Sequence, residues 1–253
     1  MVSTSETSQG RNLARFAELI TNCSDFGESY QPSRETIKLA GLQSLYDQLV
    51  AAVGTEGKAL VDYKNATNER EASFKGLGNL ATRIFNSIDS SEASPLVVND
   101  VRSLVNKIRG SHRRTKKNDQ PEEPPAGNEP EPGTEPAATP VHHSTSHMSY
   151  DVRLENFMSL IRLLESQQEY SPNEPELKIP SLNQLYGRLM EMNAGVIRAT
   201  SAFGNAHIAI NFLFRDENKG LNAVARDVKK YVKSAYGATS PQYRKVSSIS
   251  IKG

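Results

Sequence analysis

The sequence predicts an all-α protein, with two tandem antiparallel helical-bundle units of three to four helices each. Three observations support this: apolar residues recur at helical intervals in both halves, a stretch of one half returns in the other, and a Pro- and Glu-rich segment lies between them. That segment has too little apolar area to offset the entropy of ordering, so we expect a disordered linker. The predicted divisions are a disordered N-terminus at 1–10, unit one at 11–110, a basic then acidic linker at 111–150, unit two at 151–245 and a tail at 246–253.

The repeat is clearest when residues 30–49 are compared with residues 170–189. Seven of these twenty positions are identical, namely Tyr30/Tyr170, Pro32/Pro172, Lys38/Lys178, Leu42/Leu182, Leu45/Leu185, Tyr46/Tyr186 and Leu49/Leu189. Further along, the motif at 75–78 returns at 219–222 with four residues inserted. An internal duplication explains this pattern. The repeated tyrosines are more typical of rings at the edge of a core than of a binding surface.

Each unit is predicted to open with a short amphipathic helix. Leu13, Phe16 and Ile20 recur at intervals of three and four residues, which places them on one helical face. In the second unit, the same kind of face is formed by Leu154, Phe157, Leu160, Ile161 and Leu164. A polar loop containing Pro32 or Pro172 follows.

A long helix comes next in each unit. In the second unit, apolar residues at steps of three and four run from Leu182 to Ile210, which predicts a helix of about 30 residues and roughly 45 Å. Such a stripe faces partner helices, either within its own unit or in another chain. The first unit keeps the phase but contains Gly54 and Gly57, which each cost about 1 kcal/mol relative to alanine. We therefore expect the first unit to be less stable.

Further helices complete the units. The periodicity nearly runs through into a third helix, so one continuous helix is an alternative, but glycines near 75–78 and 215–220 favour a turn. In the first unit, Ser94 as N-cap and Pro95 at the first helical position predict a fourth helix. The second unit has the same signal at Ser240 and Pro241, but its β-branched end at 246–253 predicts an extended tail.

Composition restricts the location of the protein. The single cysteine, Cys23, excludes an intramolecular disulfide and is expected in or near the core. Residues 1–10 lack the basic and apolar regions of a signal peptide, and no apolar run reaches the roughly 20 residues that span a bilayer. We therefore expect a cytoplasmic protein.

No motif in the sequence predicts a catalytic, cofactor-binding or metal site. The pattern at 76–81 fits a dinucleotide-binding loop, but that chemistry needs a preceding strand, and a helical stripe precedes it here. His142, His143 and His147 lack the ligand framework of a zinc site, and His207 is typical of a partly buried histidine. We predict no cofactor and no enzymatic activity.

The strongest functional signal is basic. One cluster follows the first unit, and a second lies on the last long helix of the second unit, where Tyr231 and Tyr236 flank it. Such clusters neutralise phosphates on nucleic acid or anionic lipid, although cations also complement the C-terminal end of a helix dipole. The candidate phosphate contacts are Arg109, Arg113, Arg114, Lys116, Lys117, Arg226, Lys229, Lys230 and Lys233.

The second unit resembles a group of uncharacterised all-helical proteins seen in Bacteroidetes. The resemblance extends from Tyr170-Ser-Pro-Asn through the run that begins at Asp227-Val-Lys-Lys-Tyr-Val and ends at Ser240-Pro-Gln-Tyr-Arg. A fainter echo lies in the first unit, which departs from the Asp-Val-Lys-Lys-Tyr-Val stretch. The resemblance implies a helical fold and a bacterial cytoplasm, and it transfers no activity.

These features favour a non-catalytic interaction or assembly protein with two tethered binding units. Its expected partner is another protein or a second copy of itself. One alternative is a nucleic-acid-associated protein that uses the basic clusters, and another is a long-helix effector or envelope-associated protein.

Overall fold

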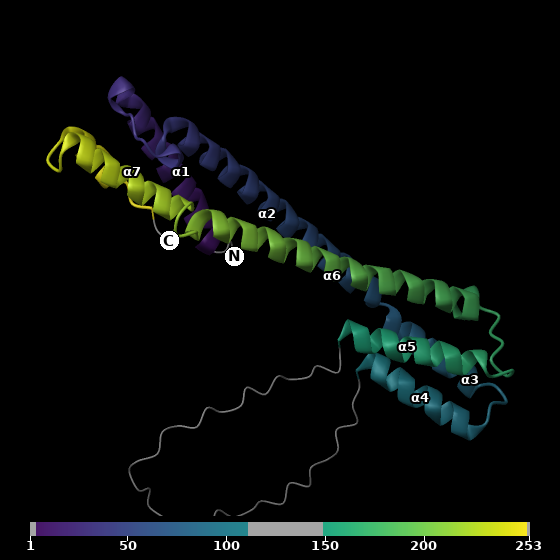
Figure 1. Ribbon diagram of the computed structural model, residues 1–253. Helices are drawn as coiled ribbons and strands as arrows, with labels where there is room; N and C mark the ends of the chain where they lie inside the picture. Colours follow the sequence, from purple (N-terminus) through teal and green to yellow (C-terminus); the bar gives the residue numbers. More distant parts are fainter. Residues whose placement is uncertain (1–3, 111–148, 252–253) are drawn as a thin grey trace, which may run out of the picture. The chain divides into compact units, whose positions relative to one another are not determined.

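The computed structural model describes residues 4–110 and 149–251, and within these ranges it is helical with no strand, which confirms the all-α prediction. Before residue 111 lie α1 (Thr4–Asp25), α2 (Leu39–Phe74), α3 (Leu77–Asp89) and α4 (Pro95–Arg109), with 3-10 turns η1 (Gly27–Ser29) and η2 (Glu35–Ile37). After residue 148 lie α5 (Tyr150–Glu165), η3 (Pro175–Leu177), α6 (Ile179–Arg215), α7 (Leu221–Tyr236) and α8 (Pro241–Ser247), as Figure 1 shows.

The internal repeat is visible in matching local structures. Tyr30 is 5% exposed and donates its hydroxyl to the carbonyl of Ile37 at 2.6 Å; Tyr170 is 8% exposed and donates to the carbonyl of Leu177 at 2.7 Å. Each tyrosine thereby ties its loop to the 3-10 turn that precedes a long helix. These bonds confirm the structural role predicted for this tyrosine pair.

The predicted turns after the long helices are confirmed. Helix α2 ends at Phe74 and α3 begins at Leu77, while α6 ends at Arg215 and α7 begins at Leu221. Gly76 has right-handed helical angles and leads directly into α3, so the glycine pattern at 76–81 connects two helices and has no strand before it. This backbone is not the loop of a dinucleotide site.

The division into compact units differs from the predicted one. One unit contains residues 1–69 and 194–253, and the other contains residues 70–193, so each includes part of both repeats. The expected units at 11–110 and 151–245 are therefore not the compact units.

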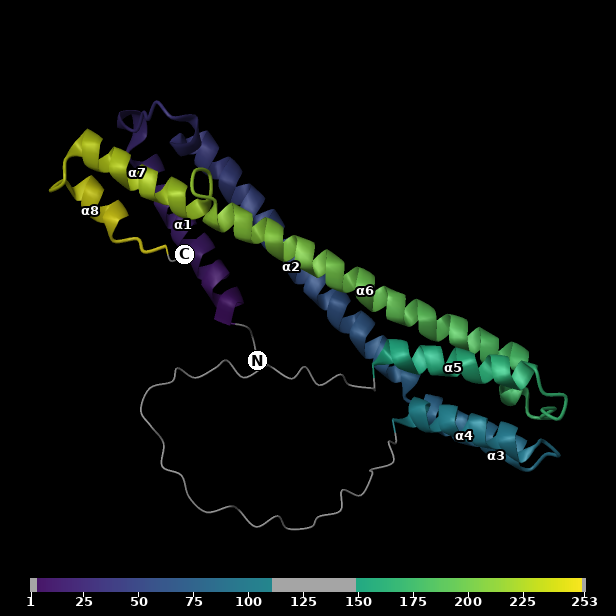
Figure 2. The same ribbon diagram turned by 60° about the horizontal axis from the view of Figure 1, so that its bottom comes forward.

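The core of the first compact unit combines helices from both ends of the chain. Its fully buried side chains include Phe16 and Leu19 of α1, Leu42 of α2, Ile210 of α6 and Val228 of α7. The contacts of α7 are with η2, α1 and α8, and Figure 2 shows α7 and α8 side by side. The last part of the second repeat thus packs on the first part of the first repeat.

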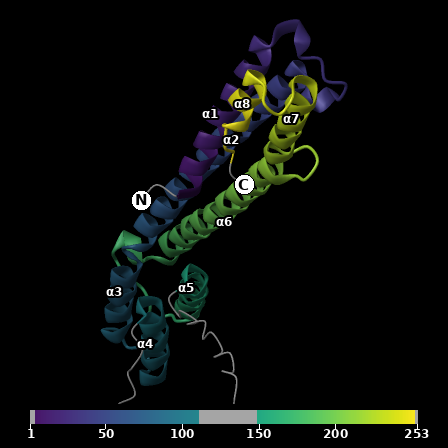
Figure 3. The same cartoon turned by 90° about the vertical axis from the view of Figure 1, so that its left-hand side faces the viewer.

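The core of the second compact unit combines the last part of the first repeat with the first part of the second repeat. Buried Ile84 of α3, Val101 of α4, Phe157 of α5 and Leu182 of α6 belong to one cluster. Helix α4 packs against both α3 and α5, and α3 contacts η3 (Figure 3). Both ends of segment 111–148 therefore enter the same compact unit, so this segment, which lies outside the described residues, does not connect the two units.

Two predicted chain ends need correction. The prediction of a disordered N-terminus at 1–10 is wrong for residues 4–10, because α1 begins at Thr4. This polar stretch lacks apolar periodicity, but it contains no proline that would stop a helix. The prediction of an extended tail at 246–253 is wrong for residues 246 and 247, which belong to α8. Helix α8 continues to Ser247, since Ser240 caps it by accepting from the amide of Tyr243 at 3.1 Å and Val246 is fully buried.

A candidate anion-binding groove

The first compact unit carries a basic groove along α7. A cavity of about 360 Å³ is lined by Asn222, Ala225, Arg226, Lys229, Lys230, Lys233, Tyr243 and Ile251, which we call the α7 groove. Six of these residues lie on α7. The five that follow Asn222 come three, four, seven, eight and eleven positions after it, so all six share one helical face. The structure thus brings together all four cations that the sequence predicted on this helix.

The far wall of the groove is built by the C-terminal end of the described chain. Helix α8 supplies Tyr243, and the segment that follows it supplies Ile251. The ammonium of Lys229 donates to the carbonyl of Ile249 at 2.5 Å, and Ile249 is fully buried. Lys229 therefore holds this segment against α7, and burial lowers the pKa of its ammonium below the ordinary value.

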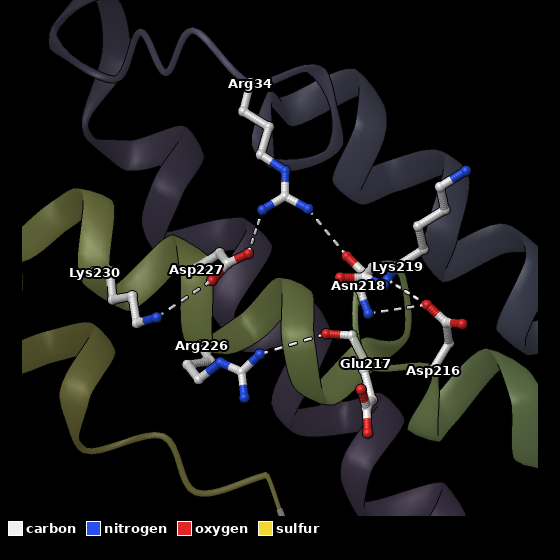
Figure 4. Close-up of polar contacts among 8 residues, drawn as sticks. All are labelled: Arg34, Asp216, Glu217, Asn218, Lys219, Arg226, Asp227 and Lys230. Atoms are coloured by element: carbon white, nitrogen blue, oxygen red, sulfur yellow. Dashed lines mark hydrogen bonds and ion pairs between the residues drawn. The ribbon is translucent and has the colours of Figure 1, made fainter.

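The loop before α7 is held by a network of polar contacts (Figure 4). The carboxylate of Asp216 accepts from the backbone amides of Asn218 at 3.0 Å and Lys219 at 2.6 Å, which orders the loop and lowers the pKa of Asp216. Arg34 donates to the carbonyl of Asn218 at 3.0 Å and to Asp227 at 2.5 Å. This network anchors the insertion that distinguishes the second repeat from the first.

The charge of the groove is strongly positive. None of its lining residues is a carboxylate. Asp227 on α7 lies 3.8 Å from Lys230 but is also paired with Arg34, so it cannot offset the groove cations alone. The side chain of Lys230 is 71% exposed to solvent.

Two uncharged groups add specific chemistry. The Oδ1 atom of Asn222 is buried without a hydrogen-bond partner, and a buried polar group in that condition costs about 1–3 kcal/mol. Rotation of the amide would present its NH₂ group to an anion. The ammonium of Lys233 lies over the face of the Tyr243 ring, 5.8 Å from its centre, which is the arrangement of a cation–π contact.

The equivalent face of the first repeat is not basic. With the four-residue insertion counted, Arg226, Lys229, Lys230 and Lys233 correspond to Thr82, Phe85, Asn86 and Asp89. Helix α4 also has fifteen residues where α8 has seven, and it buries Val101 and Val105. The cationic groove is therefore a property of the second repeat and not of the shared fold.

The remaining predicted phosphate contacts do not join this groove. Arg109 is exposed in the last turn of α4, in the other compact unit, where it complements the helix dipole. Arg113, Arg114, Lys116 and Lys117 lie outside the described residues, as do His142, His143 and His147.

The tyrosines that flank the basic cluster in the sequence face the interior. The Tyr231 ring meets Tyr30 edge to face at 5.3 Å, and its hydroxyl accepts from the amide of Gln31 at 3.0 Å. Tyr236 packs against Phe26 at 5.4 Å. Neither ring lines the α7 groove, although both tyrosines flank the basic cluster in the sequence.

Sequence reasoning missed Asn222, Tyr243 and Ile251 as groove residues. Asn222 shares the helical face of Arg226, four positions earlier, so helical spacing could have identified it. Tyr243 and Ile251 reach the groove only because α8 turns back along α7. No local pattern signals that return.

Other candidates from the sequence have structural roles. Nδ1 of His207 lies 2.6 Å from a carboxylate oxygen of Glu56, but the side chain is 48% exposed, so the prediction of a partly buried histidine is wrong. Cys23 is fully buried, as predicted. Among the described residues, no three His, Cys, Asp or Glu side chains gather where they could hold a metal ion. Within the same residues, no helix is both long and apolar enough to cross a membrane.

Comparisons with protein-family models, with curated proteins and with solved structures find no match for this chain. The resemblance to helical proteins of Bacteroidetes stays a prediction.

Proposed function

We propose that this chain is a non-catalytic interaction protein that holds a phosphate group of a partner macromolecule in the α7 groove. The observation that supports this most strongly is the convergence of Arg226, Lys229, Lys230 and Lys233 on one cavity that no carboxylate lines. Arginine and lysine donors in a partly enclosed site favour phosphate, because charge-assisted hydrogen bonds are about twice as strong as neutral ones.

The groove favours recognition of phosphate over recognition of a base. A cavity of about 360 Å³ suits one phosphate and its neighbouring atoms. Tyr231 and Tyr236 pack inward, so a platform of several stacked bases is not available among the described residues. We therefore expect contacts to backbone phosphates of nucleic acid, or to a phosphorylated side chain, with weak dependence on sequence.

The test measures binding of the full chain to a labelled single-stranded RNA, a duplex DNA, and a peptide with and without phosphoserine. The variant Arg226→Gln/Lys230→Gln/Lys233→Gln removes three groove cations and leaves Lys229 to hold Ile249. The matched control is Arg244→Gln/Lys245→Gln, which removes exposed cations of α8 that do not line the groove.

With about three phosphate contacts, affinity for RNA should fall roughly 20-fold between 50 and 200 mM salt. The groove variant should flatten this salt dependence and bind at least tenfold more weakly, while the control should bind nearly as the parent does. Failure of all three phosphate-bearing probes to bind at 50 mM salt would refute the proposal. So would an equal loss of affinity in the groove variant and the control.

A further inference from the structure

The outer face of α6 is apolar where a solvent-facing helix is ordinarily polar. Ile197, Ile208 and Phe212 are 63%, 68% and 62% exposed. They lie on one helical face with the exposed residues Ser201, Gly204 and Asn205. The opposite face of α6 buries Ile210 and Phe214 in the core and stacks Phe203 on Tyr63 at 6.2 Å. Exposed apolar clusters of this kind are typical of interaction sites.

The first repeat provides an internal comparison. Residues 199–214 of α6 contain no Asp, Glu, Lys or Arg, whereas the equivalent residues 59–74 of α2 contain five. Position by position, Ile208 corresponds to Asn68, Ala209 to Glu69 and Gly204 to Lys64. Because both helices occupy the same place in the repeat, the fold itself does not require an uncharged face. The absence of charge on this face is therefore specific to α6.

We infer that this outer face of α6 is the interface of a homodimer in which two copies of α6 pack antiparallel about a two-fold axis near Gly204 and Asn205. The face is self-complementary in that arrangement. Ile197 of one copy lies opposite Phe212 of the other, and Ser201 lies opposite Ile208. Gly204 has no side chain and open space around it, so the helices can approach closely at the axis.

Charge and area both fit a second copy. A face that meets its own copy brings like charges together, and this face has none between residues 199 and 214. The three large side chains and the small residues between them bring roughly 500–600 Å² per copy, so a dimer would bury about 1,000–1,200 Å², near the lower limit of a specific interface. Phe212 also borders a cavity of about 350 Å³, which gives Ile197 of the second copy a recess at this end.

The oligomeric state of the full chain tests this inference. Sedimentation equilibrium should show a monomer–dimer equilibrium at micromolar concentrations. The variant Ile208→Asn/Phe212→Ala introduces the residues that the first repeat carries at these positions, and should weaken dimerisation at least tenfold. The matched control Val50→Asn/Val61→Asn changes two exposed aliphatic residues of α2, 46% and 54% exposed, and should leave the dimer intact.

A second experiment tests the antiparallel register. Ser201→Glu and Ile208→Lys should each weaken the dimer, whereas the double variant should restore it, because each introduced carboxylate then faces the introduced ammonium of the other copy. A parent chain that stays monomeric at 100 µM, or assembles beyond a dimer, would overturn the inference. It would also be overturned by failure of the double variant to recover affinity, or by a control variant that loses the dimer equally. These outcomes are independent of phosphate binding in the α7 groove.

Discussion

Replacing Tyr30 or Tyr170 by phenylalanine should destabilise the protein through the loss of one buried hydrogen bond at the same point of each repeat. Each hydroxyl donates to a carbonyl of a buried residue seven positions later, at 2.6 Å to Ile37 and 2.7 Å to Leu177. Phenylalanine keeps the ring and its packing, so the substitution isolates the hydroxyl.

The magnitude follows from the carbonyl left unpaired. A buried polar group without its partner costs about 1–3 kcal/mol. Replacement of Tyr30 and of Tyr170 should therefore each cost about 1–2 kcal/mol. In a protein of this size, 1 kcal/mol lowers the midpoint of thermal unfolding by roughly 2–4 °C.

Urea unfolding followed by circular dichroism and by tyrosine fluorescence measures these losses. Tyr46→Phe, at the partly buried edge of the first core, is the control and should change the stability by less than about 0.5 kcal/mol. If Tyr30→Phe and Tyr170→Phe are as stable as the control, these loops are not fixed in the way the structure describes, and the equivalence of the two repeats loses its main support.

Other expected outcomes concern single residues. Burial raises the pKa of the Cys23 thiol to about 11, so thiol reagents should label the native protein at least about a hundredfold more slowly than the unfolded chain. A Cβ at Gly41 would lie 2.2 Å from the carbonyl oxygen of Glu35, so Gly41→Ala should cost about 1–3 kcal/mol in urea unfolding. Burial raises the pKa of Tyr170 to about 12; the unfolded chain ionises first, so stability should fall between about pH 10 and 12, and less steeply in Tyr170→Phe.

The sequence was sufficient to predict the long helices and the turns that follow them. Side chains such as Phe16 and Leu182 mark buried faces through spacing alone, and Ser94 and Ser240 mark helix starts through local capping. These signals depend on residues within one or two turns of each other, so they can be read without knowing the tertiary structure.

The composition of the compact units could not be predicted in that way. The periodicity of α2 and α6 shows which face is buried but not which helix covers it, and α7 packs on η2 of the other repeat. For the same reason the sequence showed only that Tyr231 and Tyr236 flank the basic cluster. The residues they pack against, Tyr30 and Phe26, lie about 200 positions away in sequence. Only the fold shows that these rings face the core.

The central claim is that each compact unit combines part of the first repeat with part of the second. The most direct test is to cut the chain between residues 119 and 140 at an engineered protease site. Each compact unit contains residues from both sides of the cut. The two fragments should therefore elute together under native conditions, at the mass of the intact chain, and separate only in denaturant. Two fragments that separate in buffer and each keep the helix content of the intact chain would contradict the account.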